Sequence, residues 1–161
     1  MSTTAAAAAA DAAGAADAAA ATGSPSVADR LEIQELVTRH ALWMDERART
    51  DPRLLFTEDV SVTTPAGPVQ GIGPLVDRIH RHHPAEERAQ HLLGNVLVDL
   101  DGDRAAVRAL LHVTRIPRPD AEPLFLGGTY EYQAVRTAAG WRLSRLKMTP
   151  LWRTGPWPAH H

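Results

Sequence analysis

The second half of the chain alternates apolar and polar residues in long runs, which is the pattern of β-strands with one buried face. These runs cover residues 91–100, 104–116, 124–136 and 141–151. The first two are joined by Asp101-Gly102, and Asp-Gly between alternating runs predicts a hairpin because glycine adopts the positive φ of a tight turn. The sequence therefore predicts an antiparallel meander in its second half.

The first half shows helical periodicity instead. Apolar residues recur at three- and four-residue spacing over residues 27–47, which predicts an amphipathic helix. The elements that follow are a short helix after Asp51-Pro52, a short strand at 60–63, a turn at 65–68, and a helix that opens at Gly73-Pro74 and breaks at Pro84. Helices followed by a meander indicate an α+β fold, with the helices packed on one face of the antiparallel sheet.

The predicted strands carry apolar residues on both faces. One face would pack on the helices, so the other face needs a second cover. A two-fold homodimer through that face is the simplest arrangement.

Composition divides the chain into three parts. Residues 1–26 are Ala-rich and have no amphipathic pattern, which predicts a disordered and dispensable tail. A single domain over residues 27–155 and a flexible tail at 156–161 complete the expected organisation. The N-terminus lacks the basic start and leucine-rich stretch of a secretory signal, and no run reaches the ~20 apolar residues that span a membrane.

Charge and cysteine usage exclude several classes of protein. The net charge of -2 gives no indication of a nucleic-acid or acidic-membrane partner. The absence of cysteine removes disulfides, thiolate metal sites and cysteine nucleophiles, and it fits a cytoplasmic location.

The most informative candidate is His91, because it opens a long strand. Side chains alternate faces along a strand, so His91, Leu93, Asn95 and Leu97 are expected on one side. If that side is the concave one, the sheet holds an imidazole at the mouth of an apolar pocket. In the first helix, His40 lies near the centre of the apolar stripe and Asp45 at its edge.

The order of elements and motifs resembles a known superfamily. A helix is followed by F-T-E-D-V, a short hairpin, a second helix, H-L-L-G-N-V-L-V-D-L-D-G-D and G-G-T-Y-E-Y-Q-A-V-R-T-A-A-G-W-R-L. This order, over residues 27–153, resembles the SnoaL-like branch of the NTF2-like superfamily. The resemblance implies a cone-shaped α+β domain whose curved sheet encloses an apolar pocket.

Within that superfamily the chain looks most like the scytalone dehydratase and dehydrochlorinase type. The resemblance implies a catalytic pair of Asp45, near the end of the first helix, and His91, at the start of a long strand. The acid/base Asp of the cyclase branch and the Asp-Arg-Asp set of the epoxide hydrolases have no clear counterpart here.

The remaining candidates would line the pocket and contact substrate. They are His40, Trp43, Phe56, Asn95, Tyr130, Tyr132 and Trp152. For His40 and the aromatic residues, packing in the core or the sheet is the competing interpretation. His91 could instead be a structural residue of its strand, and Asp45 a solvated carboxylate near a helix C-terminus.

Two other patterns are weaker. His80, His82 and His83 invite a metal site, but no carboxylate or cysteine pattern completes a ligand set, so a solvated helix end is expected. Gly71-Ile72-Gly73 lacks the third glycine of a dinucleotide site. No cofactor or metal is expected.

Together these features predict a cofactor-independent acid/base enzyme of the dehydratase or lyase, cyclase or isomerase type. Its substrate would be a small apolar or polyketide-like molecule, with His91 as general base and Asp45 orienting it. The alternative is a non-catalytic NTF2-like module that binds a ligand or dimerises.

Overall fold

The computed structural model describes residues 26–83 and 85–155. Helix α2 (Val27–Asp45) begins at Ser26, whose side-chain oxygen accepts a hydrogen bond from the Asp29 amide at 3.3 Å. This is an ordinary N-cap, and it explains why the helix starts where the alanine-rich segment ends. The expected tails therefore lie outside the described residues, apart from Ser26.

After α2 the chain forms a short helix, a two-stranded hairpin and a second α-helix. A short 3-10 helix η1 (Pro52–Leu54) leads into β1 (Phe56–Thr64). An antiparallel hairpin joins β1 to β2 (Gly67–Gln70), and α3 (Ile72–His82) follows. The strand expected at 60–63 is therefore longer than the sequence pattern indicated.

Four long strands make the expected meander. They are β3 (Arg88–Asp101), β4 (Arg104–Ile116), β5 (Leu124–Thr137) and β6 (Gly140–Arg153), each antiparallel to the next. Gly102 has φ of 56° in the turn between β3 and β4, so the Asp-Gly hairpin prediction is confirmed.

The sheet differs from the expectation in one pairing. Its strand order is β2-β1-β6-β5-β4-β3, and β1 runs parallel to β6. The sheet is therefore mixed rather than purely antiparallel. The long path through α3 and three strands brings β6 back in the same direction as β1, and such non-local pairing leaves no mark in the local pattern.

A bulge in β3 overturns the expected face of Asn95. The pairing with β4 shifts between Gly94 and Leu97, and Asn95 has φ of 49°. Because a bulge inserts an extra residue, the alternation changes phase. His91 and Leu93 face inward, whereas Asn95 and Leu97 are exposed.

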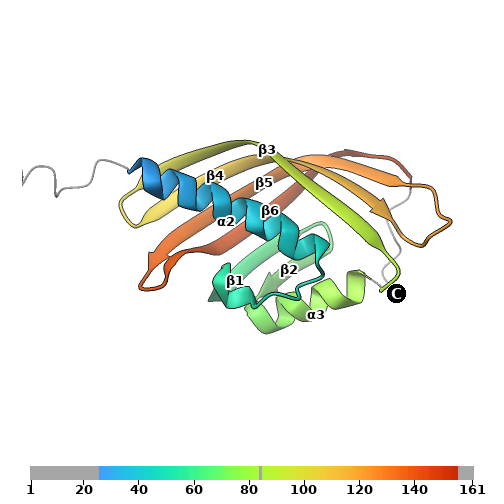
Figure 1. Cartoon of the computed structure of the whole chain (residues 1–161), viewed down its shortest axis with the longest axis horizontal. Coiled ribbons are helices and arrows are strands. Elements are labelled where there is room, and N and C mark those ends of the chain that lie inside the picture. The colour runs from blue at the N-terminus through green and yellow to red at the C-terminus, as the bar shows by residue number, and fades with distance from the viewer. Residues whose placement is uncertain (1–25, 84, 156–161) are drawn as a thin grey trace, which may run out of the picture.

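Helix α2 lies across the concave face of the sheet and α3 lies beside β1 and β2 (Figure 1). The core between α2 and the sheet is formed largely by Ile33, Val37, Val60, Val107, Ala109 and Leu143. The α+β fold class, with a curved sheet covered by helices on one face, is confirmed. Within the described residues, no helix is long and apolar enough to cross a membrane.

Candidate functional site

The expected pair of Asp45 and His91 comes together where α2 ends against β3. The Nδ1 atom of His91 lies 2.6 Å from Oδ1 of Asp45. The same carboxylate also accepts the backbone amide of His91, at 3.1 and 3.0 Å from its two oxygens. Asp45 therefore fixes both the main chain and the ring of His91.

This contact decides which ring nitrogen is basic. A carboxylate is an acceptor, so a neutral imidazole beside it carries its proton on Nδ1 and leaves the lone pair on Nε2. The His91 side chain is 6% exposed, compared with 20% for Asp45. The arrangement can accept a proton at Nε2 and stabilise the resulting cation through Asp45.

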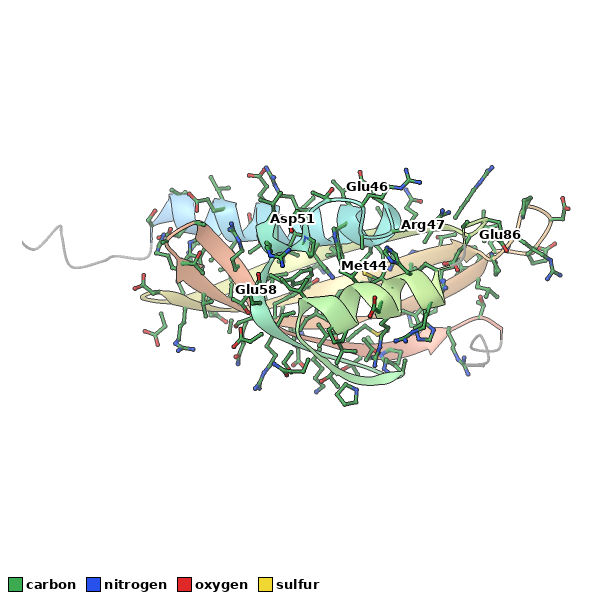
Figure 2. All side chains as sticks on the ribbon, turned by 90° about the horizontal axis from the view of Figure 1, so that it is seen from below. Met44, Glu46, Arg47, Asp51, Glu58 and Glu86 are labelled. Atoms are coloured by element: carbon green, nitrogen blue, oxygen red, sulfur yellow. The ribbon has the colours of Figure 1, made fainter. Side chains whose placement is uncertain are left out.

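The end of α2 is held in place by its own chain reversal. Arg47 and Ala48 both have positive φ, and the Ala48 amide donates to the Trp43 carbonyl at 2.9 Å. The Arg47 guanidinium donates to the carbonyl of Glu87, in the segment before β3. Figure 2 shows Met44 at this end of α2, between α2 and α3. The helix terminus and the start of β3 are therefore tied together around the pair.

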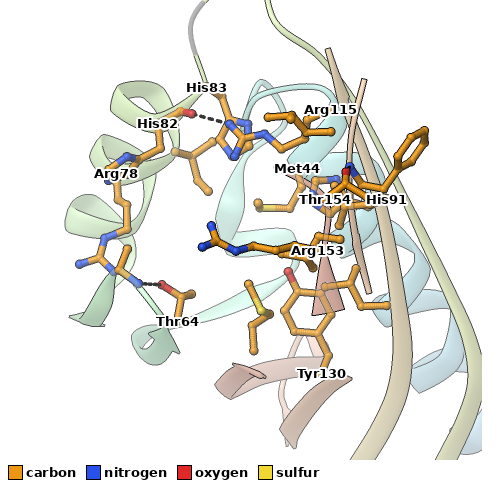
Figure 3. A pocket seen from close by; sticks show the side chains of 18 residues that line it. Met44, Thr64, Arg78, His82, His83, His91, Arg115, Tyr130, Arg153 and Thr154 are labelled. Atoms are coloured by element: carbon orange, nitrogen blue, oxygen red, sulfur yellow. Dashed lines mark hydrogen bonds between the residues drawn. The ribbon is translucent and has the colours of Figure 1, made fainter. Parts of the chain in front are cut away.

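His91 lines a pocket between the end of α2, α3 and the concave face of the sheet (Figure 3). The cavity volume is about 160 Å³. Its apolar walls include Met44, Ile79, Leu111, Val113, Leu126 and Met148. An apolar cavity with few convergent polar groups is the usual form of a small-molecule site.

Tyr130 is the second candidate that reaches the pocket. It lines the cavity and is 5% exposed. Burial, and then the nearby charge of Asp45, raise the pKa of its hydroxyl above the ordinary value. Tyr130 therefore keeps its proton and can donate a hydrogen bond.

His40 and Tyr132 lie behind this wall rather than in it. Both are buried, and the Tyr132 hydroxyl lies 3.3 Å from Nδ1 of His40. The His40 ring meets Tyr130 edge-on, with centroids 5.4 Å apart. Burial, and then the neighbouring His91, lower the pKa of His40 to about 3, so His40 is neutral at physiological pH. The two residues support Tyr130 and the floor of the pocket.

The other aromatic candidates do not line the cavity. Trp43 is buried in the core and donates from Nε1 to the Thr50 carbonyl at 3.1 Å. Phe56 packs against Trp43 and His40. These large apolar rings are used to fill the space between α2 and β1.

Trp152 lies on the outer face of the sheet, 51% exposed, with its ring over Gly127 and 5.6 Å from the His112 ring. A Cβ atom at Gly127 would lie 2.2 Å from the Trp152 ring, so only glycine permits this approach. Asn95 is likewise exposed, at the β3 bulge. Neither residue contacts the pocket, and both expected positions are wrong.

Sequence reasoning missed the polar groups opposite His91. Arg78, Arg115, Arg153, His82 and His83 also line the pocket. The expectation of a solvated end for α3 is therefore wrong for His82 and His83, whereas His80 is exposed. Strand alternation contained one usable signal, because Arg115 is in phase with the buried Leu111 and Val113 of β4.

Glu87 lies behind the pocket lining and binds two of these polar side chains, Arg115 and His83. Its side chain is 3% exposed and accepts Arg115 Nε and a terminal nitrogen at 2.7 Å each, and His83 Nδ1 at 3.1 Å. Burial opposes ionisation of Glu87, but the hydrogen bonds from His83 and Arg115 outweigh it and lower the pKa to about 2. Glu87 is therefore a buried carboxylate that holds the Arg115 guanidinium and the His83 ring in place at the pocket wall.

Among residues 26–83 and 85–155, no group of three or more His, Cys, Asp or Glu side chains is arranged to hold a metal ion. The Asp45 carboxylate is directed to His91, and the Glu87 carboxylate to Arg115 and His83.

Comparison with known proteins agrees with this architecture. The chain is 32% identical over 125 residues to the uncharacterised protein Rv2910c of Mycobacterium tuberculosis, covering 74% of this chain and 83% of that protein. The crystal structure of Kfla4162 from Kribbella flavida superposes with a TM-score of 0.71 at 29% identity, covering 78% of this chain and 93% of that one.

Neighbours of known type show the same fold at lower identity. The hexachlorocyclohexane dehydrochlorinase LinA Type2 superposes with a TM-score of 0.68 at 18% identity, covering 84% of this chain and 97% of that one. A structure described as a putative scytalone dehydratase, from Novosphingobium aromaticivorans, superposes with a TM-score of 0.67 at 18% identity, covering 76% of this chain and 83% of that one. The sequence itself matches the SnoaL-like domain over residues 25–147. The chain therefore belongs to the SnoaL-like domain family, with an NTF2-like fold.

Proposed function

We propose that this protein is a cofactor-independent acid/base enzyme that removes a proton from a carbon next to a carbonyl in a small, largely apolar substrate. The observation that carries the proposal is the 2.6 Å contact between Asp45 and a His91 ring that lines an apolar pocket. General-base catalysis needs a basic nitrogen within reach of the substrate and a partner that fixes its tautomer. Two structural neighbours are named for eliminations, a dehydrochlorinase and a putative dehydratase, and an elimination likewise begins with removal of a proton from carbon.

In the proposed reaction, His91 Nε2 takes the proton and the electron pair of the C–H bond moves into an enolate. Tyr130 retains its hydroxyl proton and donates to the developing enolate oxygen. In an elimination, this electron pair then forms a carbon–carbon double bond as the β-substituent departs. A departing hydroxide takes the proton from the His91 imidazolium and leaves as water, which returns His91 to its neutral form. Isomerisation or cyclisation would begin with the same step.

The test is proton exchange in heavy water with a panel of small cyclic β-hydroxyketones. We expect deuterium to enter the carbon next to the carbonyl, and the unsaturated ketone to form from those substrates that fit. General-base catalysis contributes about 10²–10⁴-fold, so His91→Ala should lose about that factor while its melting temperature stays near that of the unmodified protein.

His80→Ala is the matched control, because His80 is exposed and does not line the pocket. Exchange that persists within tenfold in a folded His91→Ala protein would refute the catalytic role. Saturable ligand binding with no exchange by the unmodified protein would instead identify a non-catalytic binding module.

We also propose that the protein forms a two-fold homodimer through the outer face of the sheet. Five large apolar side chains are exposed on this face: Leu92, Leu97, Leu110, Phe125 and Trp152. Exposed apolar patches of this kind indicate an interaction surface. Light scattering at micromolar concentration should give twice the chain mass, and Leu110→Glu should give the monomer mass. A monomer mass for the unmodified protein would contradict the proposal.

A further inference from the structure

The pocket has a second imidazole that is held by a carboxylate, in addition to His91. The Nδ1 atom of His83 lies 3.1 Å from Oε1 of Glu87. The His83 side chain is 10% exposed and lines the cavity, whereas the Glu87 side chain is 3% exposed and lies behind the lining. The pair of His83 and Glu87 is therefore built like the pair of His91 and Asp45, with the ring at the cavity and the carboxylate behind it.

The contact with Glu87 decides which nitrogen of His83 a ligand can reach. Burial opposes ionisation of Glu87, but the hydrogen bonds from His83 and Arg115 lower its pKa to about 2, so the carboxylate is ionised at neutral pH. An ionised carboxylate only accepts hydrogen bonds, and Nδ1 of His83 therefore carries a hydrogen. The two nitrogens of an imidazole lie on different sides of the ring. Nε2 therefore points away from Glu87 and is the nitrogen available to a ligand in the cavity.

The main chain around His83 is held in place as well as the ring. His83 is the C-cap residue of α3, and its amide donates to the Ile79 carbonyl at 3.0 Å. Arg115 of β4 donates to the His82 carbonyl at 2.9 Å and to the two Glu87 oxygens at 2.7 Å each. These contacts keep Nε2 of His83 in one position, and proton transfer requires such a fixed geometry.

The partners of the two imidazoles differ in charge. When His91 takes a proton, its pair with Asp45 changes from one negative charge to none. When His83 gives up a proton, its cluster with Glu87 and Arg115 changes from one positive charge to none. Each ring therefore reaches electrical neutrality with its direct partners by moving a proton in the opposite direction. This difference suits His91 to accept a proton and His83 to donate one.

The two imidazoles also approach the cavity from different sides. Figure 3 shows His83 on the α3 side of the pocket and His91 on the side of the long strands. Both rings line the same cavity, whose volume is about 160 Å³. A small substrate that presents a C–H bond to His91 therefore has another side that faces α3.

We propose that His83 is a second catalytic residue, the general acid for a leaving group on the side of the substrate away from His91. This inference rests on the proposed function, because His91 must first take the proton from carbon. His91 can return that proton only to a leaving group on its own side of the substrate. A hydroxyl group on the other side needs a separate acid, and His83 Nε2 is placed to supply it.

The proposed elimination moves one proton at each ring. His91 takes the proton from carbon, and the electron pair of that bond forms the carbon–carbon double bond. The bond from carbon to the hydroxyl oxygen breaks with its electron pair, the oxygen takes the proton from Nε2 of His83, and water departs. His91 then loses a proton to solvent and His83 gains one from solvent, which restores both residues.

The probes are two isomers of a cyclohexanone that has a methyl group on the carbon next to the carbonyl and a hydroxyl group on the following carbon. The single hydrogen on the methyl-bearing carbon lies on the opposite face from the hydroxyl group in the cis isomer. It lies on the same face as the hydroxyl group in the trans isomer. Both isomers lose water to give the same unsaturated ketone, which is measured by its ultraviolet absorbance. We expect the unmodified full chain to convert the cis isomer at least as fast as the trans isomer, because the cis isomer uses two fixed imidazoles.

His83→Asn then tests the role of the ring. Asparagine keeps an N–H donor near the position of Nδ1 for Glu87 but has no counterpart of Nε2. General-acid catalysis contributes about 10²–10⁴-fold, so the variant should lose about that factor with the cis isomer and keep the trans rate within about threefold. Deuterium exchange with both isomers should also persist, because His91 is unchanged. The matched control is His80→Asn, which alters an exposed histidine of the same helix and should change neither rate.

A merely structural role of His83 predicts a different result, since a distorted pocket would slow both isomers together. A folded His83→Asn protein with an unchanged ratio of cis to trans rates would overturn the proposal. Conversion of the trans isomer alone by the unmodified protein would also overturn it, and this measurement decides if the variant does not fold.

Deuterium exchange separates this inference from the proposed function. Exchange by the unmodified protein without loss of water from the cis isomer would remove the role of His83 and leave His91 as the base. Absence of exchange in the unmodified protein would remove the proposed function, and the inference with it. His91→Ala should stop exchange and slow the conversion of both isomers, whereas His83→Asn should slow only the cis isomer.

Discussion

Helix α2 carries a carboxylate near each end, and both carboxylates reach the sheet. Near the start of the helix, Asp29 accepts Arg136 at 2.6 Å and the indole nitrogen of Trp141 at 3.1 Å. At its last residue, Asp45 accepts His91 at 2.6 Å. The contacts are alike in length, but Arg and Trp donors keep their protons, whereas an imidazole gains and loses one.

The helix itself treats the two carboxylates differently. The positive end of the helix dipole favours the charge of Asp29, and hydrogen bonds from Arg136, and then Trp141, lower its pKa. The negative end of the dipole disfavours the charge of Asp45. The hydrogen bonds from the His91 ring and the His91 amide offset this effect. The contacts of Asp29 therefore only hold α2 against the sheet, whereas those of Asp45 are also suited to proton transfer.

The strongest test of this difference is to remove the charge at each end separately. Asp45→Asn should reduce proton exchange by about 10²-fold or more, because the amide no longer stabilises an imidazolium at His91. Asp29→Asn should leave the exchange rate within about twofold, because its partners do not touch the pocket. Both rates are measured in heavy water with the substrate that gives the fastest exchange. Equal losses in the two variants would show that activity follows general stability rather than the Asp45–His91 pair.

A third titratable side chain of α2, His40, links the comparison to the pH dependence of stability. His40 lies between the two carboxylates and is buried, with its pKa lowered from 6.5 to about 3. As pH falls below 6.5, the unfolded chain binds a proton that the folded chain does not, so stability is lost on acidification. We expect the free energy of unfolding to fall by up to about 1.4 kcal/mol per pH unit from this residue alone, with the full slope reached about one pH unit below 6.5.

His40→Gln keeps a hydrogen-bonding group for the Tyr132 hydroxyl but does not titrate. Urea unfolding at several pH values between 6.5 and 5 measures the slope in both proteins. This range lies above the ordinary pKa of 4.5 for Glu87, so acid loss of that ion pair contributes little to the slope. If the free energy of unfolding depends on pH equally in the variant and in the unmodified protein, His40 is not the group that takes up the proton on unfolding.

The smallest effect is expected from a substitution near Asp29, at the start of α2. Trp141→Phe removes the donor to Asp29 but keeps most of the buried ring, which is 3% exposed. We expect the melting temperature to fall by about 2–4 °C, as for the loss of one hydrogen bond, with no change in exchange rate. Circular dichroism and the exchange assay measure the two quantities. A loss of exchange here would mean that both ends of α2 contribute to the site.

Much of the fold could be predicted because its signals are local. The Asp101-Gly102 turn, the alternation of β4 and the three- to four-residue spacing of α2 each depend on neighbouring residues. The parallel pairing of β1 with β6 joins segments far apart in the chain, so it could not be predicted in this way. The bulge had a local signal that the strand prediction did not use: glycine inside a strand often marks a bulge, and asparagine tolerates positive φ, as in Gly94-Asn95.

The site was predicted unevenly for a similar reason. The pairing of Asp45 with His91 came from a resemblance in motif order, since periodicity alone put Asp45 at the edge of the helix face. Arg115 and Arg153 lie near strand ends, where arginine is usually solvated, and their place in the pocket depends on how β4, β6 and α3 meet. Sequence patterns identify the faces of elements more readily than the space that those faces enclose.

The double use of Asp45 has a consequence for tracing function among relatives. Because its carboxylate accepts a main-chain amide as well as the imidazole, Asp45 secures the junction of α2 and β3 whatever stands at position 91. If His91 is the proposed base, we expect a relative without catalytic activity to keep the aspartate for this structural contact, while its residue at position 91 can change. On the proposed function, we therefore expect the residue at position 91, rather than Asp45, to distinguish enzymes from binding proteins among relatives.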